Sequence, residues 1–350
     1  MPLGEFALID RYFRAAGAPR ADVVLGVGDD GAILRPPPGC DLIAVSDTLV
    51  EGVHFPVGSP AASVGHRALA VNLSDIAAMG ATPAWALLAL TLPQVDEAWL
   101  EEFARGFSAL ARAHEVALVG GDTTRGPLMI NVQVMGFVPQ RQGLRRSGAR
   151  PGDLLCVSGT PGDAAAGLRC LQTTDLLDAP ADQSIREAWR ALQQRFEYPT
   201  PRVDLGLRLS AIASACIDVS DGLAGDLDKM LAASRCAAII DLHALPRSAA
   251  MSSLIEAGAI SELDALRLAL AGGDDYELAF CVPASRRSAL DELMPEGAIS
   301  VIGEVAELKD SAAPRLSFRS GRKALTDVAL ADAALADLLK TAGGFDHFAV

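Results

Sequence analysis

The sequence predicts a two-domain protein of the α/β (α+β) class, in which helices and strands are mixed. The chain has 350 residues, which is long enough for about two domains that each bury a core. Half of the residues are hydrophobic and only 21% are charged, a globular composition without signs of bulk disorder. Short apolar runs with strand character alternate with helical patterns in both halves of the chain.

The first half is expected to hold a mixed sheet with helices. An amphipathic helix should run through Phe6, Ile9 and Phe13 and stop at Gly17. Apolar and β-branched runs predict strands at 23–28, 42–46, 84–92, 116–119 and 128–138, and helical spacing predicts helices at 63–80 and 96–114. The segment 139–151 is polar and rich in Gly, Pro and Arg, so we place a domain boundary there, between 1–138 and 139–350.

The second half repeats the mixture of strands and helices. Strands are expected at 153–158, 216–219, 237–242, 276–282 and 299–305. The segment 159–167 is expected to open a helix, and another is expected at 203–215. A third helix should follow S-D-G-L-A-G-D-L and continue to Ala233, and two more should lie between the strand at 237–242 and Gly272. The polar stretch 172–183 is expected to be a loop.

Composition and charge exclude several kinds of partner. The formal net charge is −14, which argues against nucleic-acid binding because that needs a basic face. No apolar run is long enough to span a bilayer, and the first residues do not resemble a signal peptide, so a cytoplasmic protein with no membrane partner is expected. The six cysteines form no C-x-x-C pair and are expected to be buried thiols.

Acidic residues recur where predicted strands give way to small residues. The sequence shows this at Asp29-Asp30, Asp47, Asp122, Asp218 with Asp221, and Asp274-Asp275, and Asp75 adds a carboxylate on an apolar helix. Each site alone is usually a turn residue or a helix cap. Together they would gather carboxylates that repel one another, which a hard divalent cation such as Mg²⁺ resolves. No Cys/His cluster suits zinc, and no EF-hand loop is present.

Magnesium held by many carboxylates points to phosphoryl transfer. The chain has no Gly-Lys dipeptide and no lysine before Lys229, so a Walker A loop is excluded. If ATP is used, metal ions and arginines must contact its phosphates, and Arg145 and Arg146 are the candidates, with Arg125 behind them. The alternative for these arginines is a solvated linker.

Six motifs, in order along the chain, resemble the thiamine-monophosphate kinase family. They are V-G-D-D-G-A, S-D-T-L-V-E-G-V-H-F, N-L-S-D-I-A-A-M-G-A, G-G-D-T-T-R-G, I-D-V-S-D-G-L-A-G-D-L and G-G-D-D-Y-E-L. The resemblance implies direct, in-line transfer of the γ-phosphate of ATP to thiamine monophosphate, assisted by several Mg²⁺ ions and without a catalytic side chain. It also implies the fold of aminoimidazole-ribonucleotide synthetase, with N-terminal domains paired in a homodimer and a C-terminal α/β domain that completes the cleft.

The resemblance also implies roles for individual residues. Positions similar to the family's metal ligands are Asp30, Val45 (through its backbone), Ser46, Asp47, Asp75, Asp122, Asp218 and Asp221. Positions similar to ATP contacts are Gly121, Asp122, Arg146 and Ser220, and positions similar to substrate contacts are His54, Asp274 and Phe345. The family usually has Glu where this chain has Asp274, which shortens the reach of that contact by one methylene, and Ala is commoner than Gly31.

Two other functions fit parts of the sequence. A related synthetase that activates an amide or selenide with ATP would carry a glycine-rich or Cys-bearing N-terminal segment, and none is evident. A non-catalytic Mg²⁺- or nucleotide-binding protein would explain the carboxylates but not His54, Arg146 and the paired G-G-D motifs.

Overall fold

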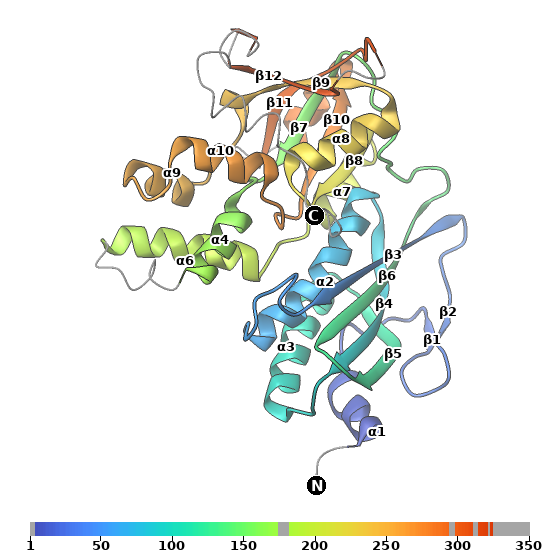
Figure 1. Cartoon of the computed structure of the whole chain (residues 1–350). Coiled ribbons are helices and arrows are strands. Elements are labelled where there is room, and N and C mark those ends of the chain that lie inside the picture. The colour runs from blue at the N-terminus through green and yellow to red at the C-terminus, as the bar shows by residue number, and fades with distance from the viewer. Residues whose placement is uncertain (1–3, 174–181, 294–297, 311–313, 321–322, 325–350) are drawn as a thin grey trace. The chain divides into compact units, whose positions relative to one another are not determined.

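A computed structural model describes residues 4–173, 182–293, 298–310, 314–320 and 323–324. By its internal contacts the chain divides into two compact units. The first comprises Met1–Gly143 and Val203–Leu207, and the second comprises Leu144–Arg202 and Arg208–Val350. Both units combine helices with a sheet, as the α/β (α+β) class predicts (Figure 1).

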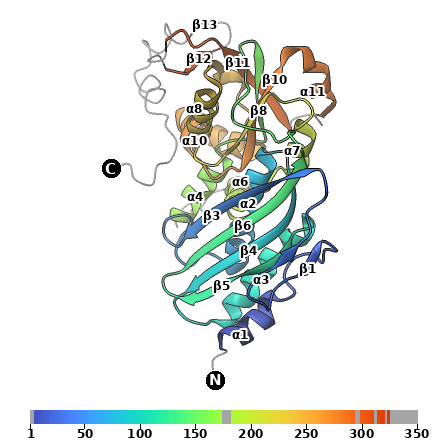
Figure 2. The ribbon, with the colours of Figure 1, turned by 90° about the vertical axis from the view of Figure 1, so that its right-hand side faces the viewer.

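The first unit is a four-stranded sheet with two helices on one face. Its elements are α1 (Glu5–Leu8), the π-helical turn η1 (Ile9–Phe13), β1 (Val23–Leu25), β2 (Ile33–Leu34), β3 (Cys40–Val50), α2 (Ala61–Ala78), β4 (Thr82–Leu92), α3 (Glu97–Ala113), β5 (Ala117–Arg125) and β6 (Met129–Pro139). The strand order is β3-β6-β4-β5, and only the β4–β5 pair is parallel. Figure 2 shows the four strands side by side, with α2 and α3 behind them.

The core of the first unit lies between this sheet and its helices. Helix α2 is buried along almost its whole length, because most of its side chains are small or aliphatic and the helix is covered by the sheet and by α3. Leu73 of α2 and Phe103 and Phe107 of α3 are fully buried. The opposite face of the sheet is more exposed, so strand residues alternate between a covered inner face and an open outer face.

Two strands of the first unit are longer than their sequences suggest. We expected strands at 42–46 and 116–119 that end before their acidic residues, but β3 continues to Val50 and β5 continues to Arg125. Strand β3 pairs with β6 without a break from Cys40 to Val50, and β5 pairs with β4 as far as Arg125. Asp47 and Asp122 are therefore inside strands, where backbone pairing with a neighbour outweighs the polar character of the segment.

The second unit is built on a seven-stranded sheet. Its strands are β7 (Asp153–Ser158), β8 (Ala215–Val219), β9 (Ala237–Asp241), β10 (Glu277–Pro283), β11 (Ile299–Ala306), β12 (Leu316–Ser320) and β13 (Lys323–Ala324), in the order β13-β12-β9-β11-β7-β10-β8. Its helices are α4 (Asp163–Gln172), α6 (Gln183–Glu197), α8 (Leu223–Ser234), η2 (Leu242–Ala244), α9 (Ala249–Glu256), α10 (Glu262–Ala271), η3 (Ala284–Arg286) and α11 (Arg287–Leu293). Leu227 and Met230 of α8 belong to its main core cluster.

Two helical segments differ from the expectation. Helix α6 was not predicted, although Trp189, Leu192 and Phe196 are buried at helical spacing. The helix expected at 203–215 ends at Leu209 (α7, Val203–Leu209). Most of the expected loop at 172–183 lies outside the described residues. Among those that are described, no helix is long and apolar enough to cross a membrane.

Candidate active site

Strand β3 presents Ser46 and Asp47 on opposite faces of the first sheet. Residues that face one another on paired strands project to the same side. Ser46 pairs with the exposed Gln133, so it lies on the outer face, whereas Asp47 pairs with the buried Val132 and lies on the inner face. Val45, two residues before Asp47, shares the inner face with it.

Asn72 of α2 fixes the backbone of β3 at Asp47. Its Oδ1 accepts a hydrogen bond from the Asp47 N–H at 3.1 Å, and its Nδ2 donates to the Ala68 carbonyl at 3.1 Å. Strand β3 is at the edge of the sheet, so Asn72 provides a partner for an edge N–H. Asp75 lies one helical turn further along α2 and is half-buried in an otherwise buried stretch.

Asn131 of β6 fixes the same segment from the outer face. Its Nδ2 lies 3.1 Å from Ser46 Oγ, 3.2 Å from the Asp47 carbonyl oxygen and 2.8 Å from Thr48 Oγ1. Asn131 is not among the site residues predicted from the sequence. A polar residue inside the apolar run of β6 was the available signal, because such a residue in a strand needs partners.

Asp122 lies on the outer face of β5, in the same row across the sheet as Asn131. Both residues are paired in register with Ala89 of β4. The preceding Gly121 has φ of 150°, and a Cβ there would lie 1.8 Å from the Leu88 carbonyl oxygen. Only glycine fits so close to β4, and the Asp122 backbone is placed accordingly.

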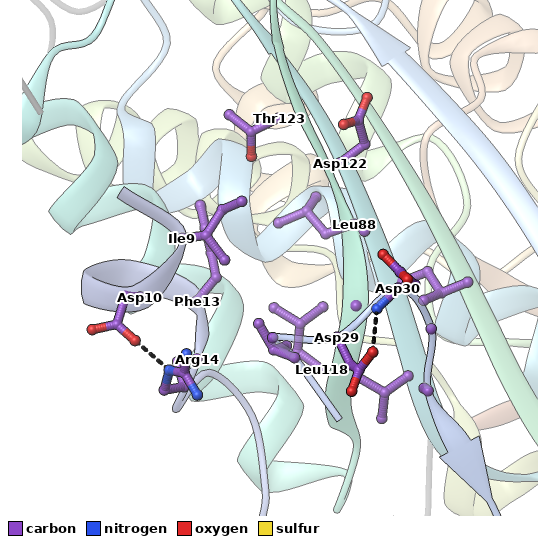
Figure 3. Close-up of a pocket in the computed structure, with 18 of the residues that line it drawn as sticks. Ile9, Asp10, Phe13, Arg14, Asp29, Asp30, Leu88, Leu118, Asp122 and Thr123 are labelled. Atoms are coloured by element: carbon purple, nitrogen blue, oxygen red, sulfur yellow. Dashed lines mark hydrogen bonds and ion pairs between the residues drawn. The ribbon is translucent and has the colours of Figure 1, made fainter. Parts of the chain in front are cut away.

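A cavity of about 1130 Å³ in the first unit contains three of the predicted site residues. Asp30, Gly121 and Asp122 line it, together with apolar side chains of η1 and of the sheet (Figure 3). Asp29 Oδ1 accepts the Asp30 N–H at 2.8 Å, which fixes the turn that carries Asp30. The structure thus brings Asp30 and Asp122, which are distant in sequence, to the wall of one cavity.

His54 follows β3 in a tight turn. Its Nδ1 accepts the Val50 N–H at 2.9 Å, and its own N–H donates to the Val50 carbonyl at 2.9 Å. Because Nδ1 accepts a hydrogen bond, the ring proton of the neutral imidazole is on Nε2. His54 is half-buried, and an Nε2–H is a donor that suits an anionic oxygen.

In the second unit, Ser220 and Asp221 follow directly on β8 and are held by Asp226. Asp226 is 1% exposed, and its Oδ2 accepts the N–H groups of Ser220 and Asp221, each at 2.9 Å. Burial raises the pKa of the Asp226 carboxyl, against the opposing effect of the hydrogen bond from Lys229. Asp218, the fourth residue of β8, is also buried.

Asp274 lies next to Ser220. Its N–H donates to the Ser220 carbonyl at 2.8 Å, and Tyr276 Oη lies 3.3 Å from its Oδ1. Asp274 itself has φ of 65°, and the preceding Gly273 has φ of 93°, where a Cβ would lie 2.7 Å from the Ser220 oxygen. This strained turn brings the G-G-D-D-Y motif to the end of β8.

A buried ionic cluster supports that turn from behind. Glu277 is fully buried, and its carboxylate accepts hydrogen bonds from Arg195 at 2.9 Å and from Arg202 at 2.5 and 2.6 Å. Asp275 is also fully buried and accepts the Gly162 and Ala164 N–H groups at the start of α4. Burial raises the pKa of Asp275 well above its usual value. These partners fix the chain on both sides of Tyr276.

Arg146 lies on a segment docked against β8 and α8. The Arg145 carbonyl accepts the Cys216 N–H at 2.9 Å, and the Arg146 carbonyl accepts Ser234 Oγ–H at 3.0 Å. The Arg146 residue is exposed. Cys216 is near the start of β8, whereas Ser220 and Asp221 follow its end. Phe345 lies outside the described residues.

The predicted metal ligands lie at the cavity wall, at the β3–α2 contact and at the end of β8, except Ser46, which lies on the outer face of β3. Within the described part of the chain, no three His, Cys, Asp or Glu side chains gather closely enough to hold a metal ion. The donors are carboxylates and one hydroxyl, which is the ligand type that Mg²⁺ takes. By chemistry the set suits magnesium.

Comparisons with known proteins place the chain in a family. The model for the AIR synthase related protein N-terminal domain matches residues 28–138, and the model for the C-terminal domain matches residues 150–313. The thiamine-monophosphate kinase of Salmonella typhimurium is 49% identical over 291 residues, 83% of this chain and 86% of the relative.

Two solved structures are similar over most of their length. The crystal structure of thiamine-monophosphate kinase from Stenotrophomonas maltophilia K279a has a TM-score of 0.79 and 47% identity, and the match covers 91% of this chain and 98% of that one. AaThiL complexed with AMPPCP and TMP has a TM-score of 0.71 and 28% identity, and the match covers 89% of both chains. The chain therefore belongs to the thiamine-monophosphate kinase family and has the two-domain fold of the AIR synthase related proteins.

Proposed function

We propose that this enzyme transfers the γ-phosphate of ATP to thiamine monophosphate and releases thiamine diphosphate and ADP. The observation that supports this most directly is the similarity to the relative complexed with AMPPCP and TMP, with a TM-score of 0.71 over 89% of both chains. AMPPCP is an ATP analogue that resists transfer of its γ-phosphate, so that relative was complexed with an analogue of the proposed donor together with TMP.

Direct in-line transfer requires little acid–base chemistry from the protein. The acceptor is a phosphate oxygen that is already ionised near neutral pH, so no side chain must remove a proton from it. Catalysis then rests on positioning the two phosphates and on stabilising charge. This agrees with a site in which side-chain oxygens fix the backbone of the predicted site residues. Asn72 accepts the Asp47 N–H, and Asp226 accepts the Ser220 N–H.

Gly121, Asp122, Arg146 and Ser220 are the proposed ATP contacts. Gly121 lets β5 approach the Leu88 backbone of β4 closely, which fixes the strand backbone there, and at Ser220 the N–H is oriented by Asp226. Arg146 would supply a guanidinium for phosphate oxygens, a role that its planar donors suit.

His54, Asp274 and Phe345 are the proposed contacts to thiamine monophosphate. The Nε2–H of His54 would donate to the phosphate of the acceptor. Asp274, fixed by Ser220 and Tyr276, would accept a hydrogen bond from the aminopyrimidine or pair with the positively charged thiazolium.

Magnesium would be held by Asp30, Ser46, Asp47, Asp75, Asp122, Asp218 and Asp221, with Val45 contributing at most its backbone. The chemistry that Mg²⁺ supplies when bound is neutralisation of phosphate charge. The protein's part is to present oxygen ligands at fixed positions, so that bringing the phosphates together needs little rearrangement.

A cytoplasmic homodimer paired through the first unit completes the proposal. The outer face of the first sheet supports this, since Leu42 is 54% exposed and Met129 is 39% exposed there. Sedimentation velocity of the full chain would give the mass of the solution species. A monomer at micromolar concentration would contradict this part.

One incubation tests the reaction. Purified protein is mixed with ATP, Mg²⁺ and either thiamine or thiamine monophosphate, and the products are followed by ³¹P NMR. We expect diphosphate resonances and ADP only with thiamine monophosphate. Diphosphate from thiamine itself, or ATP consumption without a thiamine product, would contradict the proposal.

A further inference from the structure

Lys229 places an ammonium group beside the Ser220–Asp221 turn. It lies in the second turn of α8 and reaches back toward the start of the helix. Its Nζ is 2.9 Å from Asp226 Oδ1 and forms an ion pair with Asp221 Oδ2. One cation therefore bridges two carboxylates.

The two carboxylates differ in what they can do. Asp226 is buried, and its Oδ2 is occupied by two backbone N–H groups, so it holds the turn and leaves Oδ1 for Lys229. The Asp221 side chain is 33% exposed, and it is one of the proposed magnesium ligands. The ammonium of Lys229 thus places a positive charge next to Asp221, a carboxylate that we propose as a metal ligand.

The choice of lysine is informative in this chain. Only four of its 30 Lys and Arg residues are lysines, and in the described part of the chain most ion pairs are formed by arginine. An ammonium is a compact, strongly hydrated charge on a flexible stem, whereas a guanidinium holds a carboxylate through a rigid pair of donors. Lysine can release Asp221 more readily than arginine.

We propose that Lys229 is a built-in cation that holds Asp221 in the free enzyme and competes with the divalent metal for it. The ammonium neutralises Asp221 until a metal takes its place, and Lys229 thereby lowers the affinity of the empty enzyme for metal. Lys229 is a positioning residue in this role, because it acts through Asp221. The inference rests on the proposed function, since that function makes Asp221 a metal ligand.

The test is Mn²⁺ binding to the full chain, measured by electron paramagnetic resonance without ATP or thiamine phosphates. We expect Lys229→Met to bind Mn²⁺ at least about fivefold more tightly than wild type, because one positive charge next to Asp221 is gone. Lys229→Arg keeps the charge and should bind no more tightly than wild type. Lys309→Met removes an exposed lysine elsewhere and should match wild type.

Asp221→Asn separates this inference from the proposed function. If Asp221→Asn weakens Mn²⁺ binding while Lys229→Met equals wild type, the Lys229 inference is wrong and the metal role of Asp221 stands. If Asp221→Asn binds as wild type does, Asp221 is no ligand and the inference is also wrong. A failed kinase assay does not affect either result. If Lys229→Met unfolds, the double variant Lys229→Met/Asp226→Asn also removes the buried negative charge of Asp226 that Lys229 neutralises. This double variant must then bind Mn²⁺ at least about fivefold more tightly than wild type.

Discussion

Oδ1 of Asn72 lies 3.1 Å from the backbone nitrogen of Asp47. This contact joins the buried helix α2 to the edge strand β3 at the point where the S-D-T segment begins. Asn131 holds the same segment from the other face of the sheet. The position of Ser46 and Asp47 therefore depends on two asparagines that need not touch a ligand.

Replacing Asn72 by Ala should reduce both stability and activity. The loss leaves the Asp47 N–H without this partner and opens space in a buried helix, which we expect to lower the free energy of unfolding by about 1–3 kcal/mol. The displaced strand should lower kcat/KM by about tenfold or more. Urea unfolding and steady-state kinetics measure the two effects.

Val71→Ala is the matched control, because Val71 is a buried neighbour on the same helix. It should lose a similar amount of stability and keep kcat/KM. Equal activity losses in both variants would show that Asn72 acts only through stability.

Replacing Asn131 by Ala should affect activity far more than stability. Asn131 is half-buried, so we expect the free energy of unfolding to change by less than about 1 kcal/mol. Ser46 Oγ and Thr48 Oγ1 lose a common donor, and kcat/KM should fall by about tenfold. Gln140→Ala, on an exposed turn after β6, serves as the control. Wild-type kinetics in Asn131→Ala would refute its role in positioning Ser46.

Asp75→Asn should abolish most turnover at saturating ATP while the fold survives. The substitution keeps the size of the side chain and removes the charge that a bridging metal needs. Circular dichroism and turnover are the measurements, and Asp291→Asn, in an exposed ion pair of α11, is the control because such pairs contribute little. Near-normal turnover would remove Asp75 from the metal site.

Stability should fall at mildly acidic pH because of His114. Burial lowers the pKa of His114 below its usual 6.5, although the nearby Asp204 opposes the shift. As pH falls through 6.5, the unfolded chain binds a proton that the folded chain still resists, so the free energy of unfolding decreases. His114→Gln removes this contribution. Between pH 7.5 and 5.5, wild type should lose more stability than the variant in urea titrations, and equal losses would contradict the assignment.

Local sequence patterns are sufficient to predict several helices and strands. Helix α3 was expected at 96–114 and runs from Glu97 to Ala113, because Asp96 caps it by accepting the Ala98 and Trp99 N–H groups at 3.0 and 3.1 Å. The motifs that carry the family resemblance were also readable, and the comparisons confirm the family.

Long-range pairing was not readable from the same signals. The polar run Ser46–Asp47–Thr48 looks like the end of a strand, and only its pairing with all of β6 shows that the strand continues. The roles of Asn72 and Asn131 depend on contacts across 25 and 85 positions of sequence, which no local pattern contains. Helix α6, in contrast, has apolar residues at helical spacing, so its prediction requires no long-range information.

The alternation of side chains along β3 restricts insertions and deletions in this strand. Side chains in a strand alternate with a period of two, so one inserted or deleted residue between Cys40 and Val45 would exchange the faces of Ser46 and Asp47 if the pairing with β6 slipped to accommodate it. Asn72 and Asn131 would then each meet the wrong neighbour. Homologous enzymes should therefore tolerate substitution at Ala44, an exposed outer position before Ser46, while keeping the number of residues in β3 unchanged.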